Sequence, residues 1–159
     1  DAMSPTGDIS QLPVPIGLTA IDSDALKLGV IRNLLRARRD HEALFAHGSY
    51  QPLAAHGPLG EHIVAFVRSS ANDAAITVVP RLTHAFAPVT PPVAERWRDS
   101  ELHVPADLAG TRWRCAISGI ELTFPGAPRH SLAGSNVRVP VASILATLPV
   151  ALLLRDPPR

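Results

Sequence analysis

The sequence predicts a mainly β fold: an antiparallel β-sandwich preceded by one long amphipathic helix. Before Gly48, apolar residues recur at three- and four-residue steps, the period of a helix that packs on one side. After Gly48 the period changes to short alternating runs separated by glycine, proline, asparagine or serine, which is typical of sandwich domains. We therefore divide the chain into residues 1–24, which match no pattern, a helix over 25–48 and a sandwich domain over 49–155.

An apolar stripe defines the predicted helix. It is formed by Leu28, Ile31, Leu34 and Leu35. The basic residues of this segment lie mostly off the stripe, so we expect them to face water while the stripe faces another part of a protein.

The ends of this helix carry recognisable signals. The side chain of Asp22 or Ser23 could accept the unpaired amide hydrogens of the first turn. A kink is expected near Arg39, with Asp40 capping a short second helical segment. We expect Gly48 to take the left-handed conformation that ends many helices.

The sandwich domain contains eight expected strands, at residues 50–55, 61–68, 74–79, 101–104, 111–117, 120–124, 136–139 and 150–154. A short helix is expected between residues 140 and 148, where apolar residues return to helical spacing. The longest expected loop, residues 82–97, contains several prolines.

Four apolar residues on the strongest strands are expected to form the core of the sandwich: Phe66, Ile76, Val78 and Leu152. Truncating Trp97, beside the proline-rich loop, is expected to destabilise the domain much less than truncating Phe66, unless the Trp97 ring clamps another domain.

Composition and charge exclude several classes of protein. With 46% hydrophobic and 18% charged residues among 159, the chain can form a packed core and is not disordered. A net charge of +1 gives no electrostatic footprint for nucleic acid. The arginines that do cluster, at positions 32, 36, 38 and 39, fit the solvated side of a surface helix.

The cellular setting follows from what the sequence lacks. It has no signal-peptide pattern and no apolar run near the roughly 18–20 residues needed to cross a bilayer, so we expect no membrane partner. The single cysteine, Cys115, excludes an intrachain disulfide and fits a reducing compartment. We therefore expect a cytoplasmic location.

No motif for catalysis, metal or cofactor binding stands out. The seven histidines never show a zinc-site spacing, and neither a Gly-x-Ser-x-Gly elbow nor a phosphate-binding glycine loop is present. We expect no cofactor and no metal, and we read Cys115 as a small buried apolar residue. Trp97, Trp113 and Tyr50 could each stack on a sugar ring, although packing in a core or between domains is the commoner role of such residues.

An ordered set of segments resembles a known family. They are Ile31-Arg32-Asn33-Leu34-Leu35 with Arg38-Arg39, Leu44-Phe45 with Gly48-Ser49-Tyr50-Gln51-Pro52-Leu53, His62 to Arg68, Val78-Val79-Pro80-Arg81-Leu82, Thr111-Arg112-Trp113-Arg114, and Leu145 to Leu153. Together they resemble the C-terminal region of the malto-oligosyltrehalose synthases, a family of the α-amylase superfamily (glycoside hydrolase family 13). The resemblance covers roughly residues 25 to 155. Glu42 and the stretch from Cys115 to Gly119 depart from that family's usual pattern.

The resemblance implies a reaction for which this chain has no recognisable catalytic residues. Members of the family are isomerases that move the reducing-end glucosyl link of a malto-oligosaccharide from α-1,4 to α,α-1,1, which serves trehalose biosynthesis. Retaining chemistry of this kind needs two carboxyl groups about 5 Å apart. From the end of the helix onward, almost all carboxylates lie beside predicted turns or on exposed strand faces, and none sits in a motif that matches the family's catalytic strands. We therefore assign no catalytic residue and expect the chain to be inactive alone.

Two functions of different classes remain open. In the first, the chain is the non-catalytic C-terminal portion of such an enzyme and braces a catalytic (β/α)8 barrel that precedes residue 1 and binds the malto-oligosaccharide. In the second, it is an independent β-sandwich module for carbohydrate binding or protein interaction. If the first function holds, part of the helix stripe should be exposed or covered by a neighbouring copy or by residues 1–24, whereas a stripe wholly buried against the chain's own strands would favour the second.

Overall fold

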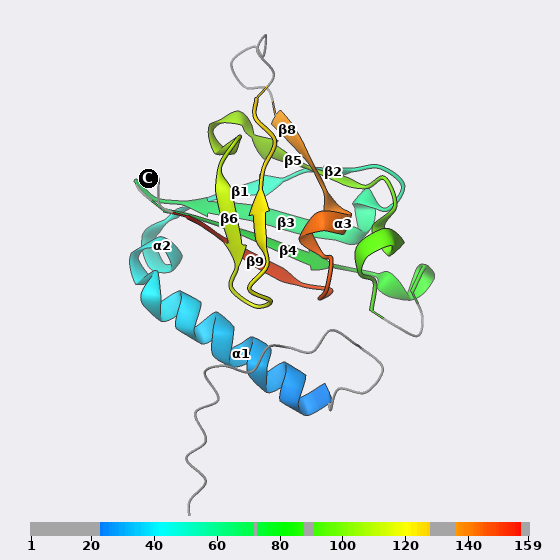
Figure 1. Ribbon diagram of the computed structural model, residues 1–159, viewed down its shortest axis with the longest axis horizontal. Coiled ribbons are helices and arrows are strands. Elements are labelled where there is room, and N and C mark those ends of the chain that lie inside the picture. The colour runs from blue at the N-terminus through cyan, green and yellow to red at the C-terminus, as the bar shows by residue number, and fades with distance from the viewer. Residues whose placement is uncertain (1–22, 72, 88–90, 128–135, 157–159) are drawn as a thin grey trace, which may run out of the picture.

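A computed structural model describes residues 23–71, 73–87, 91–127 and 136–156 and shows a sandwich of antiparallel sheets with a helix along one side (Figure 1). The larger sheet has the strand order β1-β3-β4-β9-β6-β7 and the smaller one the order β2-β5-β8. The larger sheet contains β1 (Ser49–Leu53), β3 (Ile63–Ser69), β4 (Ala74–Pro80), β6 (Arg112–Cys115), β7 (Glu121–Thr123) and β9 (Ala151–Arg155). The smaller sheet contains β2 (Ala55–His56), β5 (Glu101–Pro105) and β8 (Asn136–Pro140).

The helical elements are α1 (Ser23–Asp40), α2 (Glu42–His47) and α3 (Val141–Ile144), with 3-10 turns η2 (Gly60–His62), η3 (Thr83–Ala85), η4 (Ala94–Trp97) and η5 (Ala106–Leu108). The mainly antiparallel fold with a leading helix is the one that the sequence predicts. None of the helices in the described parts of the chain is long and apolar enough to cross a membrane.

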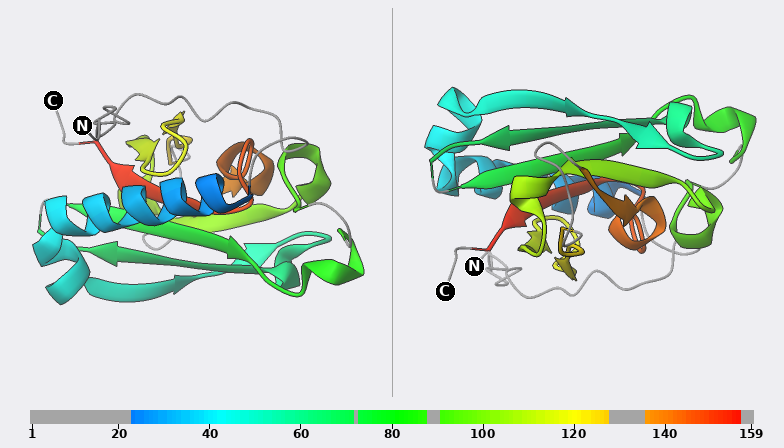
Figure 2. Two further views of the ribbon diagram at one scale, coloured as in Figure 1. Left: turned by 90° about the horizontal axis from the view of Figure 1, so that it is seen from below. Right: turned by 90° about the horizontal axis from the view of Figure 1, so that it is seen from above.

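The core lies between the sheets because apolar side chains alternate along the strands. On β3, Ile63, Ala65 and Val67 are buried, whereas Val64 between them is partly exposed on the other face. The edge-on views of Figure 2 show β1, β3 and β4 in one layer and β5 and β8 in the other. Ile76, Val78 and Leu152 are buried as predicted. The prediction for Phe66 is wrong, because this ring lies half-buried on the outer face of β3.

Trp97 corrects the sequence-based view of the proline-rich loop. This indole is completely buried, donates a hydrogen bond from Nε1 to the carbonyl oxygen of Pro92 at 3.2 Å, and meets the edge of Phe86 with 5.5 Å between ring centroids. The described C-terminal part of this loop therefore packs on the sandwich, and Trp97 is one of the largest core side chains. The expectation that Trp97 matters less than Phe66 fails for this reason.

The expected kink after Arg39 is present, because α1 ends at Asp40 and α2 begins at Glu42. The residue before α2 is His41, and its side chain makes no capping hydrogen bond, so Asp40 is not the predicted cap. The signals at the start of α1 cannot be compared: Asp22 lies outside the described residues, and Ser23 is the first residue that the structure describes.

Gly48 ends α2 for a different reason from the one predicted. Its backbone is extended (φ −59°, ψ 149°), so the expected left-handed conformation is wrong. A Cβ atom at this position would lie 2.3 Å from the carbonyl oxygen of Leu44. Glycine is needed here because the chain turns directly from helix into β1 against its own backbone.

The first expected strand, 50–55, is divided between the two sheets. Leu53 pairs with Ala65 in the larger sheet, whereas Ala55 pairs with Leu102 in the smaller one. The chain crosses from one sheet to the other at Ala54, whose carbonyl oxygen accepts a hydrogen bond from His103 N at 2.9 Å. This crossing closes one corner of the sandwich.

Candidate functional site

The helix α1 carries apolar residues on two sides. At roughly 100° per residue, one side presents the residues that pack against the core. These are Leu26, Val30, Leu34 and Ala37. Three further apolar residues point to the opposite side and are mostly exposed: Leu28 (66%), Ile31 (53%) and Leu35 (62%). We call these three the outer face of α1.

Part of the predicted stripe is thus exposed and part is buried. Leu34 packs on the core, whereas its neighbour Leu35 points to solvent. A helix that only covers a sheet needs one apolar side, and contiguous apolar side chains left in water commonly mark a contact surface. Figure 2 (left) shows α1 on the outside of the sandwich alongside β9.

Two exposed ion pairs lie toward the two ends of α1, on either side of the outer-face residues along the chain. Lys27 and Asp24 form an ion pair at 3.5 Å, and Arg39 and Asp40 form one at 3.0 Å. All four side chains are largely exposed, so each pair contributes little to stability.

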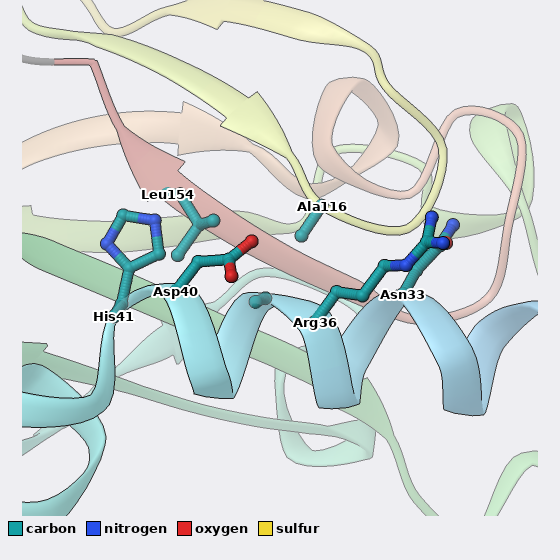
Figure 3. Close-up of a pocket in the computed structure, with 7 residues that line it drawn as sticks. Asn33, Arg36, Asp40, His41, Ala116 and Leu154 are labelled. Carbon is teal, nitrogen blue, oxygen red and sulfur yellow. The ribbon is translucent and has the colours of Figure 1, made fainter. Parts of the chain in front are cut away.

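A shallow pocket of about 210 Å³ lies on a third side of α1 (Figure 3). We call it the helix pocket; it is lined by Asn33, Arg36, Ala37, Asp40, His41, Ala116 and Leu154. In the view of Figure 3, Asn33 and Arg36 extend toward one end, while Asp40 and His41 lie at the other end near Leu154.

Two contacts fix α1 beside this pocket. Asn33 Nδ2 donates a hydrogen bond to the carbonyl oxygen of Ile117 at 3.2 Å, which ties the helix to the turn after β6. His41 Nδ1 lies 2.5 Å from Asp73 Oδ2, which ties the helix end to the turn before β4. Both contacts are partly shielded from water, where a hydrogen bond is electrostatically stronger than at an exposed site.

The three aromatic residues considered for sugar stacking lie in different surroundings. Trp97 and Trp113 are fully buried, and Trp113 stacks on Phe124 at 5.1 Å, so neither indole has a face open to a sugar in this conformation. Tyr50 is 59% exposed on β1 and lies 5.0 Å from the Phe66 ring. Sugar stacking at Tyr50 stays a prediction.

A stacked pair of histidines lies on the outer side of the smaller sheet. The rings of His56 and His103 are 4.1 Å apart between centroids. Burial lowers the pKa of His103 below its ordinary 6.5, the neighbouring His56 and Arg138 lower it further, and Glu101 opposes them. No group of three or more metal-binding side chains occurs among the residues that the structure describes.

Several carboxylates of the described chain pair with basic side chains. Asp73 pairs with His41, Glu121 with Arg114 at 3.2 Å and Glu101 with Arg138 at 3.8 Å. A retaining glucosyl transfer needs instead two carboxyl groups that face each other across a substrate. Cys115 is buried, as expected of a small apolar residue.

Comparison with known proteins gives consistent relatives. No family model matches the chain. Two curated proteins of Mycobacterium tuberculosis, from strains CDC 1551 and H37Rv, are both named putative maltooligosyl trehalose synthase and are 31% identical to it over 147 residues. A solved structure of a mutant maltooligosyltrehalose synthase from Arthrobacter ramosus superimposes with a TM-score of 0.57 at 26% identity.

These relatives are much longer than the matched stretch. The match covers 91% of this chain but 16% of each curated relative, and 86% of this chain but 14% of the solved structure. The sandwich and its leading helix therefore correspond to a small part of a far larger polypeptide.

Proposed function

We propose that this chain, which is homologous to a portion of the maltooligosyl trehalose synthases, acts as the non-catalytic C-terminal β domain of such an enzyme and braces its catalytic barrel. The observation that carries the proposal is the exposed outer face of α1. A domain that completed its own core would gain nothing from a second apolar side on this helix.

The proposed occupant of the outer face is the (β/α)8 barrel of the same enzyme. The matched stretch is 16% of each curated relative, so most of such a polypeptide lies outside it and is available to cover α1. Apolar side chains at the centre with charged residues around them form the usual anatomy of an interface. The barrel binds the malto-oligosaccharide and carries the chemistry, in the cytoplasm, on the route to trehalose.

The division of labour follows from the chemistry. Isomerisation of a terminal α-1,4 link to an α,α-1,1 link with retention requires a nucleophile and an acid/base held rigidly about 5 Å apart. This chain supplies rigidity: a closed sandwich core and a helix tied to it by Asn33 and His41. A catalytic residue misplaced by about 1 Å can lower a rate about a hundredfold, which is why such bracing matters to catalysis.

An association experiment tests the proposal. The chain is mixed with the M. tuberculosis synthase from which the matched stretch has been removed, and association and transglucosylation of maltopentaose are measured. We expect a complex with restored activity for the parent chain, and loss of both for the double variant Ile31→Asp, Leu35→Asp.

Leu82→Asp is the matched control, because Leu82 is equally apolar, is 74% exposed and lies outside α1. This variant should associate like the parent chain. Equal loss in the control and in the double variant, or a parent chain that never associates, would contradict a docking role for the outer face.

A second prediction concerns the chain by itself. Because its carboxylates lie outside the family's catalytic motifs, the purified chain should form no trehalose-terminated product from maltopentaose. Chromatography of the oligosaccharides and an assay of reducing ends check this expectation. Turnover above a protein-free blank would show that the chain contains a catalytic site of its own.

The alternative function, an independent β-sandwich carbohydrate-binding or interaction module, is favoured by one observation. The exposed ring of Tyr50 pairs with the half-buried ring of Phe66 on the outer face of the larger sheet. If this module is correct, the chain should be retarded on amylose in affinity electrophoresis and Tyr50→Ala should abolish the retardation.

A further inference from the structure

The helix pocket is built mainly from one side of α1. Asn33, Arg36, Ala37, Asp40 and His41 follow the spacing of residues that share one helix face. Ala116, just after β6, and Leu154, on β9, form the opposite wall. The pocket shares Ala37 with the core side of α1, but none of the outer-face residues Leu28, Ile31 and Leu35 lines it, so it is separate from the proposed docking surface.

The pocket is held in shape before any ligand arrives. Ala37 is buried, and Asn33 and His41 are each fixed by a contact to another element, the carbonyl of Ile117 and the carboxylate of Asp73. A binding site whose walls are already ordered loses less conformational entropy when it binds.

Each polar residue keeps hydrogen-bonding capacity that its known contacts do not use. Asn33 donates through Nδ2 to Ile117, which leaves its amide oxygen to accept. Asp40 holds Arg39 through Oδ1, which leaves Oδ2 to accept. Arg36 contributes a fork of donors, and Nε2 of His41 lies on the ring edge away from Asp73.

This mixture of groups selects a class of ligand. Alternating donors and acceptors on planar side chains match neighbouring hydroxyl groups, each of which both donates and accepts. The lining carries one guanidinium, Arg36, and one carboxylate, Asp40, at opposite ends of the pocket, so it presents no concentrated positive charge for a phosphate, and a neutral polyhydroxyl ligand suits it better. At about 210 Å³ the pocket is smaller than the roughly 300–1,000 Å³ typical of drug-sized ligands, which fits about one sugar ring.

We infer that the helix pocket is a sugar site that binds one glucosyl unit of an α-1,4-linked oligosaccharide. The pocket chemistry indicates the neutral sugar, and the choice of an α-glucan rests on the proposed function. Asp40 and Asn33 accept hydrogen bonds from the sugar hydroxyls, Arg36 donates to a hydroxyl oxygen, and Ala37, Ala116 and Leu154 contact the carbon side of the ring.

A titration of the ¹⁵N-labelled chain with maltotriose, followed by NMR, tests this inference. We expect saturable shifts at the backbone amides of Asn33, Ala37, Ala116 and Leu154. Arg36→Gln and Asp40→Asn should each weaken binding about tenfold, because each removes the charge from a group that hydrogen-bonds the sugar. Both side chains are exposed, so neither variant should perturb the fold.

Arg38→Gln is the matched control for Arg36→Gln, because Arg38 is exposed on the same helix and does not line the pocket. It should bind maltotriose like the parent chain. Inorganic phosphate, titrated separately, should leave the pocket amides unshifted.

Several results would overturn the inference: no saturable shifts with maltotriose, shifts centred on Tyr50 instead, phosphate binding in place of sugar, or an equal effect of Arg38→Gln. None of these outcomes bears on the barrel association assay, which depends on Ile31 and Leu35. The two proposals can therefore fail independently.

Discussion

The sandwich and α1 handle apolar surface in opposite ways. Along β3 and β4 the buried side chains face other parts of the same chain, and Ile76 and Val78 have no exposure at all. Along α1 the apolar residues face both inward and outward, and only the inward set meets the chain itself. The chain itself covers the apolar residues of the sandwich, whereas it leaves the outer face of α1 exposed, which is the observation behind the proposed docking role.

The variant expected to have the largest effect on the sandwich is Trp97→Ala. Removing this fully buried indole deletes a large contact area and its hydrogen bond to Pro92, so unfolding should become easier by about 3–5 kcal/mol. Phe66→Ala is the comparison and should cost roughly 1–2 kcal/mol, since that ring is half-buried. Urea unfolding followed by circular dichroism gives both values. A larger loss for Phe66→Ala would restore the sequence-based choice of core over the structural one.

Two adjacent leucines test the contrast within α1. Leu34→Ala should destabilise the chain by about 1–3 kcal/mol, because Leu34 packs partly on the core. Leu35→Ala should change stability by less than about 0.5 kcal/mol, because Leu35 is 62% exposed. Thermal melts of the two variants at equal concentration compare them directly. Similar losses at both positions would mean that the outer face is already covered in solution.

The smallest expected effect concerns pH and the smaller sheet. Burial, His56 and Arg138 hold the pKa of His103 below 6.5, so the unfolded chain binds this proton more readily than the folded one. Well above pH 6.5, His103 is neutral in both states and does not make stability depend on pH. As the pH drops through 6.5 toward the lower folded pKa, the unfolded chain gains the proton first and the stability of the fold decreases.

His103→Gln should flatten this part of the stability profile, whereas His84→Gln, at an exposed histidine, should leave it unchanged. Urea midpoints measured between pH 5 and pH 8 report the difference. A profile that is identical in the parent chain and in His103→Gln would rule out His103 as its source.

Local patterns were enough to predict the strands, because alternation and turn residues are written in neighbouring positions. The stretches at 74–79 and 136–139 lie within β4 and β8, and the short helix after residue 140 is α3. Such patterns did not reveal which segments distant in the sequence pack against one another. The crossing of the chain at Ala54 and the return of the proline-rich loop that buries Trp97 both depend on residues distant in sequence.

The candidate sites were less predictable than the fold. The apolar stripe was visible in the sequence, but periodicity alone could not show that Leu34 and Leu35 would divide between core and solvent. The helix pocket forms only where Ala116 and Leu154 lie against α1, although more than seventy residues separate them from it in the sequence. No local sequence pattern predicts this contact. The i, i+3 and i+7 spacing of Asn33, Arg36 and Asp40 was the one clue available.

The junction at Gly48 has a mechanical consequence. The helix α1 has 18 residues, so at 1.5 Å per residue it is a rod of roughly 27 Å, joined through α2 to the sheet at a point where a single added carbon would strike Leu44. A tilt of roughly 10° at such a pivot would sweep the far end of the rod through roughly 5 Å, by the same helix length. The backbone at Gly48 thus sets the direction of α1 relative to the sheet. The contacts of Asn33 and His41 with the sandwich hold the helix in that direction.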